Sequence, residues 1–224
     1  MQPTYLPWLG YFDLIKSADV FVFLDHVQFS KQSWQQRNYI LTNNGKLMLT
    51  IPVIKDSAKN KPINNVDIDH TRKPLVKHLK SIRDNYSKSK NFDIIYKELE
   101  EIYLKNNGKL MSLNINLIKY GCYKMGVDFD FIFSSSLEIN NHKVNGIIEI
   151  CEKLNATQYL SPIGAKEYID EGVFKSLGIK LTWFNYRGYK PYNQLWGEFC
   201  HDVSILDLLF NCGKDACKYL KYST

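Results

Sequence analysis

The sequence lacks the patterns that identify several large classes of protein. No run approaches the roughly 18 apolar residues of a membrane span, and the chain does not start with the basic and apolar regions of a secretory signal peptide. Internal repeats and low-complexity linkers are also absent. We therefore expect no membrane insertion, a cytoplasmic location and, from a length of 224 residues, a single domain spanning 1–224.

Cysteine is sparse and follows no metal-binding or redox pattern. The five cysteines form no CxxC, which favours reduced structural thiols. No histidine has metal-ligand spacing with another His or Cys, and HEXXH is missing, so no metal site is expected. The Walker loop, GxGxxG and the GxSxG elbow are absent as well. We therefore expect no tightly bound cofactor, and no cysteine lies near a motif histidine that would support covalent catalysis.

What the chain does contain is an ordinary apolar core composition with many aromatic residues and a basic balance. Hydrophobic residues make up 45% of the sequence and aromatic residues 14%, including 15 tyrosines. These values predict a folded globular protein. The formal net charge of +6 suits an acidic partner, which could be a phosphorylated small molecule, a nucleic acid or an acidic protein.

The order of elements predicts an α/β fold. A short helix over residues 8–16 precedes the apolar run DVFVFLD, which is typical of a buried strand in a parallel sheet. Asn43-Asn44-Gly45 joins the arms of a β-hairpin, Lys55 to Asn65 is expected to be a polar loop, and Lys73 to Gly126 has helical periodicity. Further elements are expected as a strand and turn in DFDFIFSSS, a helix over 144–154, strands over 158–161 and 179–184, a helix over 204–210 and a last helix towards Tyr222. We expect one α/β domain with a central, mostly parallel (Rossmann-like) sheet, a β-hairpin and a helical middle section.

Polar and aromatic side chains follow the first predicted strand directly. In open α/β sheets, ligands bind beyond the carboxyl ends of strands. The residues concerned are Asp25, His26, Gln28, Lys31, Trp34 and Arg37. An indole can stack on a ligand, amide and carboxylate groups can bind hydroxyls, and Lys and Arg can bind phosphate. Taken singly, each could instead cap an element or face solvent, but together they indicate a sugar or nucleotide site.

The opening segment QPTYLPW is stiffened by two prolines, which fix their φ angles. Such a loop loses little entropy when a ligand binds. If it meets the cluster after the first strand, Gln2 and Tyr5 could present polar groups to the ligand. Trp8 and Tyr11 are better explained as core residues.

Three further positions carry weaker signals. The stretch RKPLVKHLKSIRDNYSKSK, from Arg72 to Lys90, has seven basic residues and one acid, and this face could dock an acidic carrier protein, a tRNA backbone or nucleotide phosphates, or could simply be solvated. His78 lies among these cations. Ser161 precedes a turn that could face an anion, although a capping role is the simpler interpretation. Asn211 lies one turn after Asp207 and could line a pocket or satisfy buried groups.

The chain resembles the WbqC-like family of bacterial proteins nearly from end to end. The resemblance is carried by QPTYLPWLGYFDLI, ADVFVFLDHVQFSKQSWQQRN, LTIPV, HLKSIRDNYSKSKNF, SSSLEI, YLSPIGAKEYI, YNQLWGEF and VSILDLLFNCG. Family members have a short apolar strand before the Gln-Pro pair, whereas this sequence starts at Met1-Gln2. A trimmed start, or one assigned late, would leave a sheet edge exposed.

The resemblance implies a role in surface polysaccharide (O-antigen-type) assembly. It suggests a transferase that adds an acyl or aminoacyl group, such as glycyl, to the amine of a nucleotide-linked amino sugar. The donor could be carried by phosphopantetheine on an acidic acyl carrier protein or by tRNA. Such chemistry needs a base and oxyanion donors. Asp25 or His26 is the first candidate base and His78 the second, and Gln28, Lys31 or Arg37 could hold oxygen or phosphate.

Two other functions remain open at this point. One is a non-catalytic adaptor that binds a nucleotide sugar or a carrier protein within an assembly complex. The other is a glycosyltransferase, which the absence of a clear DxD motif disfavours.

Overall fold

A computed structural model of the chain describes residues 1–221. Its helices are α1 (Leu9–Lys16), α2 (Lys55–Ala58), α3 (Pro74–Tyr86), α4 (Phe92–Leu104), α5 (Leu110–Met125), α6 (Lys143–Lys153), α7 (Glu171–Ser176) and α8 (Ile205–Cys212), with 3-10 turns η1 (Ile63–Asn65), η2 (Ser134–Leu137), η3 (Ile163–Ala165) and η4 (Gly213–Tyr219). Its strands are β1 (Val20–Phe23), β2 (Arg37–Thr42), β3 (Gly45–Thr50), β4 (Asp130–Phe133), β5 (Gln158–Pro162) and β6 (Lys180–Phe184). The α/β class is confirmed.

The strands form two-stranded sheets rather than one continuous sheet. Strands β1 and β4 pair in parallel, as do β5 and β6, whereas β2 and β3 form an antiparallel hairpin. Parallel pairing is therefore present as expected, but the described residues do not join it into a central Rossmann-like sheet. The long helical stretch between β1 and β4 forms the crossover that a parallel pair requires.

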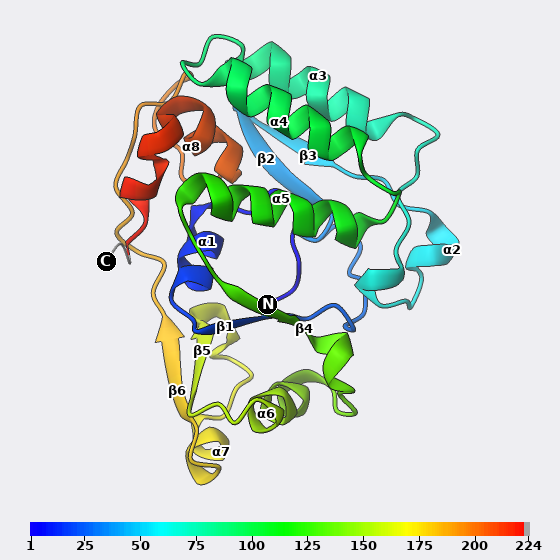
Figure 1. Cartoon of the computed structure of the whole chain (residues 1–224), viewed down its shortest axis with the longest axis vertical. Coiled ribbons are helices and arrows are strands. Elements are labelled where there is room, and N and C mark those ends of the chain that lie inside the picture. Colours follow the sequence, from blue (N-terminus) through cyan, green and yellow to red (C-terminus); the bar gives the residue numbers. More distant parts are fainter. Residues whose placement is uncertain (222–224) are drawn as a thin grey trace.

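The elements are arranged around the β1–β4 pair (Figure 1). Helices α3, α4, α5 and α8 lie on one side of it together with the hairpin, and α6, α7, β5 and β6 lie on the other. The main hydrophobic core spans the first group and the β1–β4 pair. A smaller core, which includes Cys151 and Phe174, holds the second group together.

The first residue of the chain lies along β1. The Met1 ammonium donates to the carbonyl of Val22 at 2.8 Å, and the Leu24 amide donates to the carbonyl of Met1 at 2.8 Å. Residues 2–7, here called the N-terminal loop, therefore start at the carboxyl end of β1. The loop then passes into α1, whose residues Leu9 to Ile15 are all buried.

Two expectations for local structure need correction. The stretch Lys55 to Asn65, expected to be a polar loop, contains α2 and η1, because Ile63 and Val66 are buried in the main core and anchor it. The last helix is a 3-10 turn that ends at Tyr219, and Tyr222 lies outside the described residues. The helix, strand and hairpin elements expected elsewhere are confirmed, with bounds that differ by a few residues.

Candidate functional site

Asp25 anchors the carboxyl ends of β1 and β4 to each other. Its side chain is 2% exposed, and its two oxygens accept from the Ser134 hydroxyl at 3.0 Å, the Ser135 amide at 2.8 Å and the Ser135 hydroxyl at 2.6 Å. The Asn64 amide adds a contact at 3.4 Å. A carboxylate with this many donors is well satisfied when ionised. Asp25 therefore acts as a positioning group in this arrangement.

His26 is held by the same serine that binds Asp25. Its Nδ1 lies 2.5 Å from the Ser134 hydroxyl oxygen. That hydroxyl has one proton, which it donates to Asp25, so His26 Nδ1 must be the donor in this pair. The neutral ring then carries its lone pair on Nε2. Partial burial lowers the pKa of His26, although the Asp25 charge opposes this effect. An oriented neutral imidazole of this kind can accept a proton.

A hollow of about 310 Å³ is lined in part by residues that contact Asp25 or adjoin Ser134. Its lining consists of Asn64, Lys109, Met111, Ser112, Ile115, Asn116 and Phe133. We call it the Asn64 hollow. It borders the same two segments as His26, since Asn64 bonds Asp25 and Phe133 immediately precedes Ser134. Its amide, hydroxyl and ammonium groups match sugar hydroxyls and phosphate, and its apolar groups match the C–H face of a sugar ring.

Buried amides fix the N-terminal loop at this end of β1. Asn114 of α5 is fully buried, and its Nδ2 donates to the carbonyls of Gln35 at 2.8 Å and Pro3 at 3.2 Å. The Gln35 side chain donates to Gln2 Oε1 at 2.8 Å. Asn38 Nδ2 donates to the Leu6 carbonyl at 2.7 Å, which holds Leu6 at a φ of 45° that such residues rarely adopt. The loop is thus rigid, and Gln2 is exposed at the carboxyl end of β1.

Tyr5 and His78 lie inside the core and not at this surface. Tyr5 is fully buried, and its hydroxyl is shared by His78 Nδ1, at 2.8 Å, and the Tyr103 hydroxyl. The His78 ring also bonds the backbone of Thr50, and burial lowers the pKa of His78 to about 4. Both polar ends of the imidazole are therefore used within the protein. His78 joins α3 to the N-terminal loop and the hairpin.

The expected cluster after β1 is divided between two places. Gln28 is exposed and donates to Asn60 at 3.3 Å, and Lys31 is exposed on the following turn. Trp34 is 53% exposed and its ring contacts Tyr39, while Arg37 starts β2. Only Gln2, Asp25 and His26 of the predicted residues lie at the carboxyl end of β1. Trp34 and Arg37 belong to the hairpin, because the chain turns away from β1 after Phe29.

The remaining predicted residues lie elsewhere. Ser161 is fully buried within β5, and it does not cap η3, whose N-cap residue is Pro162.

Asn211 donates to the Asp207 carbonyl one turn earlier at 2.8 Å. Asp207 itself accepts from Tyr86, Tyr192 and Gln194 and ties the 186–201 segment to α8. Asn211 therefore satisfies a buried network.

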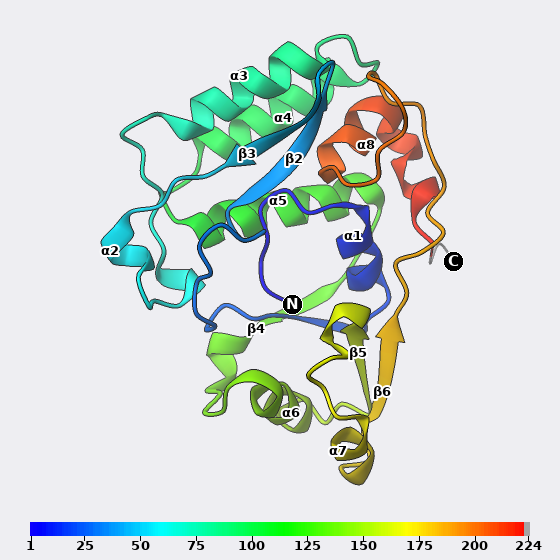
Figure 2. The same cartoon turned by 180° about the vertical axis from the view of Figure 1, so that it is seen from behind.

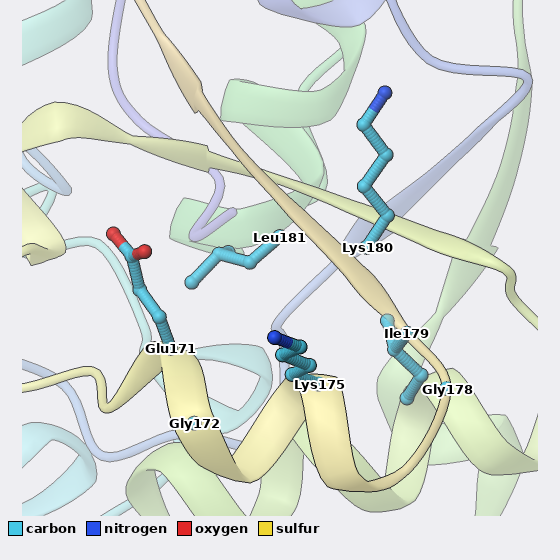
Figure 3. Close-up of a pocket in the computed structure, with 7 residues that line it drawn as sticks. All are labelled: Glu171, Gly172, Lys175, Gly178, Ile179, Lys180 and Leu181. Atoms are coloured by element: carbon cyan, nitrogen blue, oxygen red, sulfur yellow. The ribbon is translucent and has the colours of Figure 1, made fainter.

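A larger hollow, of about 490 Å³, lies between α7 and β6. Figure 3 shows that the side chains of Glu171, Lys175 and Lys180, which line it, do not converge on one point. The Glu171 carboxylate is also bonded to the Trp183 indole at 2.6 Å. None of the predicted site residues lines either hollow, but Asn64 contacts Asp25 and Phe133 precedes Ser134, so the Asn64 hollow is the better candidate.

Sequence reasoning missed several residues of the site. Ser134 and Ser135 follow β4 as Asp25 and His26 follow β1, so the rule that ligands bind beyond strand ends could have found them. Asn64, Lys109, Ser112 and Asn116 come from η1 and the first turns of α5, and no local pattern links these segments. Within residues 1–221, no three His, Cys, Asp or Glu side chains are grouped to hold a metal ion. No helix in that part of the chain is long and apolar enough to cross a membrane.

Comparisons with known proteins agree with the resemblance seen in the sequence. The model of the WbqC-like protein family matches residues 2–219. A protein of Mycobacterium tuberculosis (strain ATCC 25618 / H37Rv), described as "Uncharacterized protein Rv1507c", is 39% identical over 223 residues, which cover 99% of this chain and 96% of that protein. No solved structure gives a match. The family match extends over nearly all of the chain, and the chain belongs to the WbqC-like protein family.

Proposed function

We propose that this protein transfers an acyl or aminoacyl group to the amine of a nucleotide-linked amino sugar in surface polysaccharide assembly. The observation that carries the proposal is the neutral, oriented His26 imidazole, held by Ser134 next to the Phe133 that lines the Asn64 hollow. The family resemblance supplies the reaction class. In this assignment the sugar occupies the hollow, and the donor approaches the exposed side of His26.

The transfer step follows from these roles. His26 Nε2 accepts a proton from the sugar ammonium, and the freed amine attacks the donor carbonyl carbon. A C–N bond forms, the C–S or C–O bond to the carrier breaks, and the carrier leaves as a thiol or hydroxyl once it regains a proton. Asp25 and Ser134 keep the ring in the reactive tautomer. Asn116 and Ser112 bind sugar hydroxyls, and Lys109, whose ammonium also pairs with Asp67 at 2.6 Å, faces phosphate.

The test is incubation with a dTDP-linked amino sugar and a set of acyl and aminoacyl donors, with mass spectrometry of the sugar. A mass gain of the acyl group is expected with one donor class. His26→Asn should reduce the rate by about 100-fold or more, as loss of a general base does, while His201→Asn, at an exposed position on the α8 side, should leave it unchanged. No mass gain with any donor, or equal rates in both variants, would contradict the proposal.

A binding protein without turnover is the second candidate. It is favoured by the complete internal satisfaction of Asp25, which leaves the site with one candidate base. In that case calorimetry would detect binding of the dTDP-sugar, and Asn116→Ala would weaken this binding. No acylated product would form with any donor.

A further inference from the structure

The two faces of the β2–β3 hairpin differ sharply. Side chains alternate between the faces of a strand. Asn38 and Ile40 of β2 are buried against the N-terminal loop and the main core. Arg37 and Tyr39 therefore project from the opposite face. The pairing register places Thr50 across from Arg37, and Met48 across from Tyr39.

Towards Trp34 this opposite face is left uncovered by the helices that pack on the hairpin, whereas Leu41, the next residue of β2 on this side, is buried. In Figure 1, α3 and α4 lie in front of β2 and β3, and in Figure 2, seen from behind, the hairpin lies in front of these helices. We call the uncovered side, with the adjoining Trp34, the outer hairpin face. It comprises Trp34, Arg37, Tyr39, Lys46, Met48 and Thr50.

Two aromatic rings on this face are arranged to receive flat groups. Trp34 is 53% exposed, and its ring centroid lies 6.1 Å from that of Tyr39 in an edge-on contact. The contact leaves about half of the Trp34 surface open to solvent. An exposed indole is available to stack on a base.

Basic residues lie on or near this face. Lys46 Nζ lies 5.0 Å from the Tyr39 ring centroid. The Arg37 Nε is buried and has no hydrogen-bond partner in the described part of the chain, and Lys31 is exposed nearby in the sequence. An acid, Asp202, lies 3.5 Å from Lys46 with a side chain that is 80% exposed. An exposed pair of this kind is weak and leaves the face basic.

Stacking rings bordered by cations match single-stranded nucleic acid. Bases stack on exposed aromatic side chains, and Lys and Arg contact the phosphates. A second basic surface, on α3, presents Lys73, Lys77 and Lys80 beside Val76. It offers charge but no aromatic face, so it cannot stack a base.

We propose that the outer hairpin face binds the single-stranded end of an RNA. The inference rests on the proposed function, whose acyl donor it identifies as carried by RNA and not by an acidic protein. Trp34 immediately precedes Gln35, whose side chain bonds Gln2 at the carboxyl end of β1. The Trp34 carbonyl also accepts from the Tyr5 amide at 2.9 Å, so an RNA end that stacks on Trp34 lies next to the N-terminal loop.

The binding test uses the full chain and a short fluorescein-labelled single-stranded RNA, followed by fluorescence anisotropy. Trp34→Ala should weaken binding by about 5- to 150-fold, the effect of losing one stacked base. Thr50→Glu, which adds a negative charge to the same exposed face, should also weaken it. The matched control is Tyr123→Ala, because Tyr123 is 76% exposed on α5 and should leave binding unchanged.

Salt dependence gives a second readout. Removing one phosphate contact should lower the slope of log affinity against log salt by about 0.7 on a single strand. Lys46→Gln should show this change, whereas Lys180→Gln on β6 should not. Absence of RNA binding, equal loss in the Tyr123 control, or loss only in a Lys77→Glu variant of α3 would overturn the proposal. Binding of poly-glutamate in place of RNA would also overturn it.

A transfer assay separates this inference from the proposed function. With a small synthetic thioester donor, Trp34→Ala should retain transfer to the amino sugar, and with an RNA-borne aminoacyl ester it should lose most of it. RNA binding without transfer from any donor would reject the proposed function alone. Transfer from the thioester without RNA binding would reject the inference alone.

Discussion

Tyr5 and His78 share a buried hydrogen bond of 2.8 Å although they lie 73 residues apart in the sequence. The same Tyr5 hydroxyl contacts the Tyr103 hydroxyl. This contact fastens the N-terminal loop to α3 and α4 at one point in the core. Rigidity of the loop at the candidate site thus depends on a network that no ligand touches.

Loss of the Tyr5 hydroxyl should destabilise the fold. In Tyr5→Phe the His78 nitrogen and the Tyr103 hydroxyl lose a buried partner, which should lower the free energy of unfolding by about 1–3 kcal/mol. Urea unfolding followed by circular dichroism measures this. Tyr123→Phe, at an exposed position, should stay within about 0.5 kcal/mol of the parent, and an equal effect in both would refute the role of the network.

The buried His78 should make stability fall in mild acid. Burial lowers the pKa of His78 from 6.5 to about 4, so between these values the unfolded chain binds a proton that the folded chain does not. The free energy of unfolding is therefore unaffected by the protonation of His78 above pH 6.5. It falls as the pH drops towards 4, by a total of about 3 kcal/mol. The parent protein and His78→Gln share all other titrating groups. The difference between their plots of unfolding free energy against pH therefore isolates the effect of His78. Parallel curves from pH 7 to pH 4 would contradict it.

Asp207 should hold the 186–201 segment in place. Burial raises the pKa of this carboxyl, while the hydroxyls of Tyr86 and Tyr192 and the amide of Gln194 donate to it. Asp207→Asn turns an acceptor into a donor that faces these groups, and should cost about 1.5–3 kcal/mol. Limited proteolysis should then cleave within 186–201 before other segments. The exposed Asp202→Asn is the matched control.

Asn114 and Asn116 should have opposite roles although they are two residues apart on α5. Asn114→Ala removes the donors to Pro3 and Gln35, and should lower stability by about 1–3 kcal/mol. Asn116 is exposed and lines the Asn64 hollow, so Asn116→Ala should keep the parent stability and weaken dTDP-sugar binding. Thermal unfolding and calorimetry together distinguish the two, and a stability loss in Asn116→Ala would be the contrary result.

The sequence predicted the fold better than the site for a physical reason. Elements such as β1 and the hairpin are encoded by local periodicity and turn residues, so DVFVFLD and Asn43-Asn44-Gly45 sufficed. The site joins β1, β4, η1 and α5, and contacts over such separations leave no local pattern. Proximity in sequence suggested that Arg37 lies with Asp25, yet β2 carries it to the hairpin. His78 lies in a basic stretch, but helical geometry turns its side chain inward while the neighbouring lysines face solvent.

The orientation of His26 should be visible in its own titration. Burial lowers its pKa and the Asp25 charge raises it, so the midpoint in the protein should lie below 6.5. Asp25→Asn removes the opposing charge, and the midpoint should fall further, provided that circular dichroism shows an unchanged fold. NMR of the histidine C2 protons measures this directly, and the signal missing in His26→Asn assigns the resonance. If Asp25→Asn instead raised the midpoint, or left it unchanged in a folded protein, Asp25 would not act on His26 in the way that the shared Ser134 hydroxyl requires.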